Sequence, residues 1–484
     1  MKYIISVDQS TSGTKAALFD ENLNKIRVLK KMHHQYYPAP GYVEHDAAEI
    51  WNNTGSLLSE IVEGIDRKDI AGLAIANQRE TTVVWERDSG CPVCHAVVWQ
   101  DVRSSYITEP MKNFANDIFN RTGLIPSPYY SAAKCAAVLS ENPGMRERAE
   151  KGELCFGTID AYLLFRLTEG RVFATDISNA ARTQLLDIHT LQWSEPIAAA
   201  FRIPKFMLAD SVLPSDAHFG EIKAIPKLEG VPVLAMMGDT NASLFGHGCI
   251  REGMVKTSYG TGSSIMMNIG GMPFASRHGL STSVGFAYQG KIDYVLEGNI
   301  TCSADTLVWL RDGLGLIQSM DELKEAESVP STDGVYLVPA FSGLGAPWFD
   351  DRAKGVLFGM TRGTTKGHVL RAALASIAHQ NADVLDAMVQ DTGTPILRLQ
   401  ADGGGSVNTL LMQMQSDYVP CKVVVSAEKE LTLTGAAKMA GMSSGLFKQD
   451  RAGLSILAEY APKMDEQQRL AERAGWLDAL RRCR

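Results

Sequence analysis

Near its N-terminus the chain reads Tyr3-Ile4-Ile5-Ser6-Val7-Asp8-Gln9-Ser10-Thr11-Ser12-Gly13-Thr14-Lys15, an apolar, strand-like run that passes directly into polar and glycine residues. The same arrangement recurs at four further junctions. The apolar runs are Gly72 to Ala76, Val231 to Met237, Val255 to Tyr259 and Ile396 to Ala401, and they are followed in turn by Asn77 to Glu80, Gly238-Asp239-Thr240, Gly260-Thr261-Gly262 and Asp402 to Gly405. Turns in any protein favour Gly, Asp and Ser, so an ordinary turn could explain one such junction, but it explains the full set of five poorly. Ligands of open α/β sheets bind beyond the carboxyl ends of strands. The pattern therefore predicts an α/β fold whose site is assembled from distant segments.

Size and composition limit the classes of protein that the chain can represent. Its 484 residues predict at least two domains, and 45% hydrophobic with 21% charged residues allow all of it to pack. A net charge of -8 without a basic block argues against nucleic-acid binding. The short apolar run at the N-terminus does not fit a signal peptide, and no 18-residue apolar segment predicts a membrane span. Eight scattered cysteines suit a reducing cytoplasm.

A glycine-rich stretch from Gly246 to Gly253 marks the expected domain boundary. We expect one domain over residues 1–248 and a second over 249–484, each with its own Gly/Thr loop, at 8–15 and at 259–262. This suggests a duplication without residue-level repeats. Helical periodicity predicts core-facing helices over 47–65 and 368–388. A further amphipathic helix over 467–484 could dock on its own domain or on a partner subunit.

The segment Cys91-Pro92-Val93-Cys94-His95 matches the spacing of redox and haem-attachment motifs. Covalent haem requires export, and no second C-x-x-C completes a zinc site. Strand-like runs flank the segment on both sides. We interpret it as two thiols in a hairpin turn.

The two Gly/Thr loops are suited to binding phosphates. Glycine lets backbone N–H groups approach phosphate oxygens, and Ser or Thr hydroxyls add donors. Asp8 at a strand end could hold Mg²⁺ through water, because Mg²⁺ retains its hydration shell. Lys15 could offset phosphate charge or be a solvated surface lysine. Walker A, protein-kinase and dinucleotide motifs are absent from these loops.

Phosphoryl transfer to a hydroxyl needs positioning and a base for the hydroxyl proton. Asp239, at a strand end between a glycine and small polar residues, is the candidate base. Arg79 and Glu80 also follow a strand and could both turn into a cleft, where a donor fork beside a carboxylate suits vicinal hydroxyls. The alternative for this pair is a surface ion pair, which contributes little.

With these residues in view, the sequence resembles the FGGY carbohydrate kinases, and within them the glycerol kinases, over nearly its whole length. Matching motifs are Asp8 to Thr11, Gly41 to Asp46, Asn77 to Trp85, Val98 to Asp101, Pro339 to Pro347, Phe358 to Gly363 and the loop at Asp402. The xylulose kinases resemble it less, because they carry a Met-His pair where this chain has Arg79-Glu80.

The resemblance implies two actin-like (ribonuclease H-like) domains with a cleft between them that closes on binding. It implies an ATP- and Mg²⁺-dependent polyol kinase, with Asp239 as general base. The polyol would be bound by Arg79, Glu80, Trp99, Tyr129, Asp239 and Thr240. Thr11, Ser12, Lys15 and Thr261 would meet phosphates, and Gly404 and Asn408 the adenosine part. A homodimer or homotetramer in the cytoplasm would be typical of the family.

Two positions depart from the glycerol-kinase pattern. Thr240 replaces a Gln beside the base, and Ser264 replaces an aromatic residue that packs on the carbon face of glycerol. The second change predicts a larger and more polar pocket. Glycerol is the expected substrate, and a longer polyol or a ketose, such as erythritol, threitol, xylitol or xylulose, is the alternative. A non-catalytic, actin-like nucleotide-binding scaffold is a second alternative, although such a protein would not need the base.

Overall fold

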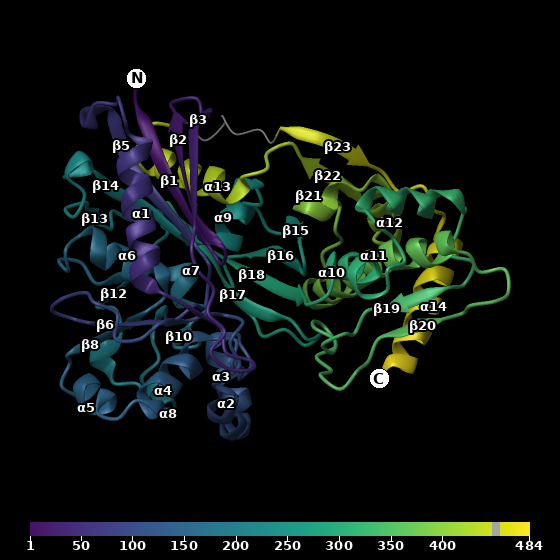
Figure 1. Cartoon of the computed structure of the whole chain (residues 1–484), viewed down its shortest axis with the longest axis horizontal. Helices are drawn as coiled ribbons and strands as arrows, with labels where there is room; N and C mark the ends of the chain where they lie inside the picture. Colours follow the sequence, from purple (N-terminus) through teal and green to yellow (C-terminus); the bar gives the residue numbers. More distant parts are fainter. Residues whose placement is uncertain (448–454) are drawn as a thin grey trace.

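The computed structural model describes residues 1–447 and 455–484. Two large sheets lie side by side, the first built mainly from the N-terminal half of the chain and the second from the C-terminal half (Figure 1). All their strands fall within residues 3–238 and 255–460, so the predicted division after residue 248 separates the sheets. The boundary itself stays a prediction.

The first sheet has the order β13-β14-β5-β1-β2-β3. Its strands β1, β5 and β14 are parallel neighbours, and β2 and β3 continue the sheet in antiparallel fashion. The strand bounds are β1 (Tyr3–Ser10), β2 (Gly13–Asp20), β3 (Lys25–Met32), β5 (Ile70–Asn77), β13 (Gly220–Glu221) and β14 (Pro232–Gly238).

The second sheet repeats this plan in the order β17-β18-β16-β15-β21-β22-β23. Strands β15, β21 and β22 are parallel neighbours, and β16 and β18 continue on the other side as antiparallel strands. The bounds are β15 (Val255–Tyr259), β16 (Ser263–Gly270), β17 (Ser281–Tyr288), β18 (Lys291–Ile300), β21 (Arg398–Asp402), β22 (Lys422–Ser426) and β23 (Ile456–Tyr460). The shared plan confirms the two-domain, actin-like fold and fits a duplication that is visible in topology only.

Two helices join the sheets. Helix α9 (Asp239–Gly246) follows β14, and helix α13 (Leu431–Ser443) packs against β1, β5 and β14 although it comes from the C-terminal half (Figure 1). The helices approach closely at Gly435, where a Cβ atom would overlap the carbonyl oxygen of Ala242. Buried Ser6 of β1 donates to the carbonyl of Leu433 over 2.8 Å. These contacts fix α13 against both α9 and the first sheet.

Other helices cover the outer faces. Helix α1 (Ala47–Ile61) begins at Asp46, whose side chain caps Ala48 N, and packs on β2 and β3. Helices α11 (Lys366–Thr392) and α12 (Thr409–Tyr418) lie against the second sheet. The remaining helices before α14 are α2 (Ser105–Met111), α3 (Ala115–Thr122), α4 (Ser131–Glu141), α5 (Met145–Glu150), α6 (Ile159–Leu167), α7 (Ile177–Ala180), α8 (Glu195–Ala200) and α10 (Asp305–Val308). Short strands pair as β4 (Glu44–His45) with β7 (Ala96–Val97), β6 (Val83–Glu86) with β8 (Leu154–Gly157), β9 (Ala174–Asp176) with β12 (Ser211–Leu213), β10 (Leu186–Asp187) with β11 (Gln192–Trp193), and β19 (Tyr336–Val338) with β20 (Val356–Phe358).

The C-terminal helix α14 (Glu466–Cys483) docks on its own chain. Its Trp476 is fully buried, and the indole N–H donates to Asp383 of α11 over 2.9 Å. Arg473 binds the same carboxylate over 2.6 Å. Of the two placements that the sequence left open for this helix, the structure has the intramolecular one. Within the described residues, no helix is both long and apolar enough to cross a membrane.

Candidate active site

The carboxyl ends of three neighbouring parallel strands bring the predicted residues of the first half together. Asp8 of β1 lies in register with Ala76 of β5, and Gly238 of β14 lies in register with Asn77. Asp239 follows Gly238 directly and begins α9. The five predicted strand runs are therefore confirmed as strands, and three of them end at one edge.

Arg79 and Glu80 are buried, at 5% and 2% exposure, so the surface ion-pair alternative is excluded. Glu80 has a left-handed backbone, with φ 61°, a conformation that is strained for a non-glycine residue. Its carbonyl accepts a hydrogen bond from Ser131 Oγ over 3.0 Å, which helps to hold that geometry. The turn lets both neighbouring side chains point to one side of the strand end. Arg79 Nε lies 4.0 Å from Glu80 Oε1 and 3.9 Å from Asp239 Oδ1.

Asp239 is the most accessible of these charged groups, with a third of its side chain exposed. Its Oδ1 accepts from the backbone N–H of Thr240 over 2.6 Å and from the Thr240 hydroxyl over 3.1 Å. Among the described residues, no donor reaches Oδ2. Thr240 therefore orients the carboxylate through Oδ1, and Oδ2 keeps its capacity to accept a hydrogen bond.

Two aromatic side chains lie next to this group. The Trp99 indole N–H donates to Thr11 Oγ1 over 2.9 Å, and its ring packs edge-on against Tyr129 with 5.8 Å between centroids. Burial, with Glu80 adding to it, raises the pKa of Tyr129 well above its usual range, so the phenol stays neutral. Trp99 therefore links Tyr129 to Thr11 of the first Gly/Thr loop. Ser12, at the tip of that loop, is exposed.

Asp8 is a buried carboxylate whose hydrogen bonding is incomplete. Its Oδ1 is buried without a hydrogen-bond partner. Burial raises the pKa of Asp8 to about 7, Asp239 adds to the rise, and Lys15 counteracts it. Lys15 is bound to Glu430 at the start of α13, with contacts of 2.6 and 2.8 Å. It is thus neither a free phosphate ligand nor a simple solvated lysine. The orphaned oxygen fits the predicted magnesium role of Asp8.

The second half contributes the remaining loops. Thr261 is exposed in the turn between β15 and β16, and its carbonyl accepts from Ser303 N over 2.8 Å. Gly403 has φ 85°, and a Cβ there would lie 2.5 Å from the Tyr259 carbonyl oxygen, so this turn requires glycine. Gly404 is exposed with nothing within 4 Å of an added Cβ. Asn408 caps α12 through its side-chain oxygen, which accepts from Leu411 N over 2.8 Å. One of its polar atoms therefore already has a structural role.

Several charged residues of this region have no sequence motif. Arg182 follows α7, Glu297 lies within the buried strand β18, and both contact the Arg79–Glu80 pair. His247, just after α9, binds Asp402 over 2.9 Å, as does Ser243 over 3.1 Å. The helix that begins with Asp239 is thereby tied to the strand end that carries the Gly403 turn. The sequence does contain a signal for Glu297, which is a charged residue inside the apolar run Val295-Leu296-Glu297-Gly298.

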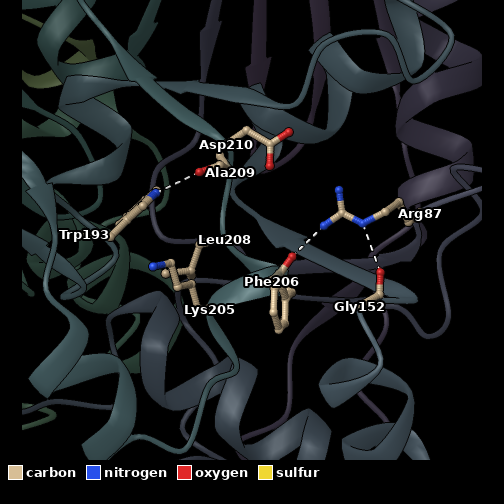
Figure 2. Close-up of a pocket in the computed structure, with 8 residues that line it drawn as sticks. All are labelled: Arg87, Gly152, Trp193, Lys205, Phe206, Leu208, Ala209 and Asp210. Carbon is tan, nitrogen blue, oxygen red and sulfur yellow. Dashed lines mark hydrogen bonds between the residues drawn. The ribbon is translucent and has the colours of Figure 1, made fainter.

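A cavity of about 400 Å³ lies elsewhere in the first half (Figure 2). It contains none of the predicted site residues. Its Arg87 donates to the carbonyls of Gly152 and Phe206 over 3.0 and 2.5 Å, and the Trp193 indole donates to Ala209 over 2.9 Å (Figure 2). These donors serve the loops that form the cavity.

The Cys91–His95 segment lies in a turn next to β6. Both cysteines are free thiols, and burial raises the pKa of Cys94 to about 11, which disfavours a reactive thiolate. The backbone bridge between Trp85 and Pro92 supports the hairpin-turn interpretation. In the described part of the chain, no cluster of His, Cys, Asp and Glu could hold a metal ion by itself.

Comparison with known proteins identifies the family. Residues 3–246 match the N-terminal domain of the FGGY family of carbohydrate kinases, and residues 255–444 match the C-terminal domain. The chain belongs to the FGGY family of carbohydrate kinases. It is 43% identical to a glycerol kinase of Shewanella sp. (strain W3-18-1), over 100% of this chain and 99% of the relative. A glycerol kinase of Shewanella oneidensis is 42% identical with the same coverage.

Solved structures of the family share this fold. A Plasmodium falciparum glycerol kinase with ADP superimposes with a TM-score of 0.94 at 33% identity, over 100% of this chain and 98% of that one. A ligand-bound xylulose kinase from Lactobacillus acidophilus gives 0.89 at 21% identity, over 99% and 97%, and shares the fold alone.

Proposed function

We propose that this FGGY kinase transfers the γ-phosphoryl group of ATP to a terminal hydroxyl of glycerol, forming glycerol 3-phosphate. The observation that carries the proposal is that Arg79 Nε lies 4.0 Å from Glu80 Oε1 and 3.9 Å from Asp239 Oδ1, so that one donor and two carboxylates come together. Those separations are too long for direct hydrogen bonds and suit bridging hydroxyl groups. The names of the full-length relatives point to the same substrate.

The residues divide the chemistry between them. Asp239 takes the proton of the attacking hydroxyl at Oδ2, while Thr240 holds the other carboxylate oxygen. Such a base contributes roughly 10²–10⁴-fold to the rate. Arg79 and Glu80 bind the neighbouring hydroxyls as donor and acceptor. Trp99 and Tyr129 cover the apolar side of the polyol and limit its mobility.

The nucleotide would be bound by the two Gly/Thr loops and the Gly403 turn. Thr11, Ser12 and Thr261 offer hydroxyl and backbone donors to phosphates. Gly404 and Asn408 would lie along the adenosine part. No atom lies within 4 Å of a Cβ added at Gly404, so the adenosine could approach the backbone closely there. Lys15 would have to leave its ion pair with Glu430 before it could contact a phosphate.

The residues also fit Mg²⁺. Asp8, whose buried oxygen lacks a partner, would hold the ion through its water shell. Bound there, Mg²⁺ would neutralise charge on the phosphates. A cytoplasmic location and assembly into a dimer or tetramer belong to the proposal as predictions, and light scattering after size-exclusion chromatography tests the second.

One observation favours a second candidate, a longer polyol or a ketose. Ser264 of β16 lies opposite Asn299 of β18, which donates to Glu297 over 2.9 Å, so Ser264 shares the sheet face that reaches Arg79. Its hydroxyl oxygen is buried without a hydrogen-bond partner. A fourth carbon with a hydroxyl group would supply one.

A coupled ADP-release assay tests the proposal. Glycerol should stimulate ADP release from Mg·ATP, with glycerol 3-phosphate as product, and Asp239→Asn should abolish the stimulation. Stimulation by a larger polyol or a ketose alone would favour the second candidate. ADP release that no polyol or ketose changes would contradict both and favour a nucleotide-binding scaffold.

A further inference from the structure

Arg79 has both of its terminal nitrogens committed to one carboxylate. Nη1 donates to Glu297 Oε2 over 3.0 Å and Nη2 donates to Glu297 Oε1 over 2.6 Å, a bidentate pair. Among the described residues, no acceptor lies within hydrogen-bond distance of Arg79 Nε, which is the nitrogen nearest Asp239. Glu297 therefore determines which edge of the guanidinium is presented to the substrate.

Glu80 is held in a similar way by Arg182. The Arg182 Nε donates to Glu80 Oε1 over 2.5 Å, and Nη1 lies 3.1 Å from Glu297 Oε2. Arg182 is only 1% exposed. Its backbone N–H donates to the Asn179 carbonyl over 2.9 Å, and Asn179 of α7 exchanges two amide hydrogen bonds, of 2.9 and 3.0 Å, with Asn77 at the end of β5. Arg182 thus holds the Glu80 carboxylate, the hydrogen-bond acceptor of the proposed polyol site, without having to touch the substrate itself.

Arg79, Arg182, Glu80 and Glu297 form a buried cluster with two positive and two negative charges. Each is at most 5% exposed, so removing one partner leaves an uncompensated buried charge. Burial alone would raise the pKa of Glu297, but Arg182 and Arg79 outweigh it and hold this pKa well below the usual range. The carboxylate consequently remains charged at every pH at which the enzyme would work.

The cluster also crosses from one sheet to the other. Arg79, Glu80 and Arg182 belong to the half that contains the first sheet, whereas Glu297 lies on β18 of the second. Gly238 makes room for Arg79, because a Cβ there would lie 2.5 Å from Arg79 Cδ. A polyol site built on the first sheet is therefore completed by a carboxylate from the second.

We propose that Glu297 and Arg182 are positioning residues for the polyol, Glu297 by fixing Arg79 with its Nε toward the substrate and Arg182 by fixing the Glu80 carboxylate. The inference rests on the proposed function, because it assigns work within that site. It differs from a purely structural ion-pair network, which would hold the two sheets together without affecting polyol recognition.

The test uses Glu297→Gln in the full-length enzyme. We expect kcat/KM for glycerol to fall about 100-fold or more with KM for glycerol rising, because a misplaced contact costs on the order of 10²-fold. The Kd for ATP should stay within about threefold, since no nucleotide residue contacts Glu297. Tyr294→Phe is the matched control on the same strand, because it removes the 2.7 Å hydrogen bond to the Ile188 carbonyl without touching Arg79. It should leave kcat/KM within a few-fold.

A double-mutant cycle separates positioning from stability. If Glu297 acts through Arg79, Glu297→Gln should add little further loss in an Arg79→Lys background. If Glu297→Gln does not fold, Glu297→Asp retains the charge, retracts the carboxylate and should still lower kcat/KM for glycerol about tenfold.

The outcomes distinguish this inference from the proposed function. A wild type that phosphorylates glycerol, with a Glu297→Gln variant that melts earlier but keeps kcat/KM, would overturn the positioning role alone. It would also be overturned if the fold-losses of kcat/KM in Glu297→Gln and Arg79→Lys multiplied in the double mutant, or if Glu297→Gln weakened ATP binding as much as glycerol use. A wild type inactive on every polyol and ketose would overturn both.

Discussion

Replacing Asp8 by Asn should stabilise the ligand-free protein while impairing catalysis. Asp8 is 8% exposed, its Oδ1 lacks a partner, and burial together with Asp239 raises its pKa from 3.8 to about 7. Between these two pH values, the folded protein keeps a proton that the unfolded chain has released. Stability therefore falls as pH rises through this window, and the full penalty is present above about pH 7.

The magnitude follows from the same shift. At roughly 1.4 kcal/mol for each pH unit, the ionised carboxylate destabilises the folded state by about 4 kcal/mol above pH 7 and by only about 1–2 kcal/mol at pH 5. The stability difference between Asp8→Asn and the wild type should thus grow by about 3 kcal/mol from pH 5 to pH 8.5. Urea unfolding without Mg²⁺ or nucleotide, followed by tryptophan fluorescence, measures it.

Asp20→Asn is the matched control at the end of the neighbouring strand β2. Burial acts to raise the pKa of Asp20, but hydrogen bonds from Asn22 and Asn24 outweigh it and lower this pKa. Its stabilising contribution is complete above the unfolded-state value of about 3.8 and is lost only below it. The Asp20→Asn difference should therefore not change between pH 5 and 8.5. An Asp8→Asn difference equally independent of pH would refute the reasoning.

Three further changes test other parts of the account. Asp239→Asn should reduce kcat by at least about 10²-fold with little change in ATP affinity by calorimetry, and retained turnover would remove Asp239 from the base role. Gly238→Ala should lower kcat/KM for glycerol by on the order of 10²-fold, because its Cβ would lie 2.5 Å from Arg79 Cδ; an unchanged value would show that Arg79 need not hold its position. Trp476→Ala should cost about 3–5 kcal/mol of stability by urea unfolding, since the fully buried indole anchors α14; a loss below about 1 kcal/mol would contradict this anchoring.

Much of the fold could be predicted because strand ends leave a local signal. Apolar runs that change abruptly to Gly, Asp and Thr located β1, β5, β14, β15 and β21, and helical periodicity located most of α1 and α11. The order of strands in each sheet had no such signal, because register depends on contacts between distant segments. The position of α13 between the sheets is a tertiary feature of the same kind.

The site could be predicted only where a residue follows a strand end or belongs to a family motif. Asp8, Arg79, Glu80 and Asp239 met that condition, and the structure brings them to one edge. Glu297 did not, because it lies inside a strand and its partner Arg79 is 218 residues away in sequence. The Lys15–Glu430 ion pair escaped prediction for the same reason, as the two residues are 415 positions apart.

The central claim is that Arg79, Glu80 and Asp239 form a glycerol-phosphorylating site. The most direct test is kcat/KM with saturating Mg·ATP across glycerol, erythritol, threitol, xylitol and the common ketoses. The account predicts the highest value for glycerol, with every substrate losing activity in Asp239→Asn. A ketose or a larger polyol that exceeds glycerol by orders of magnitude would contradict it.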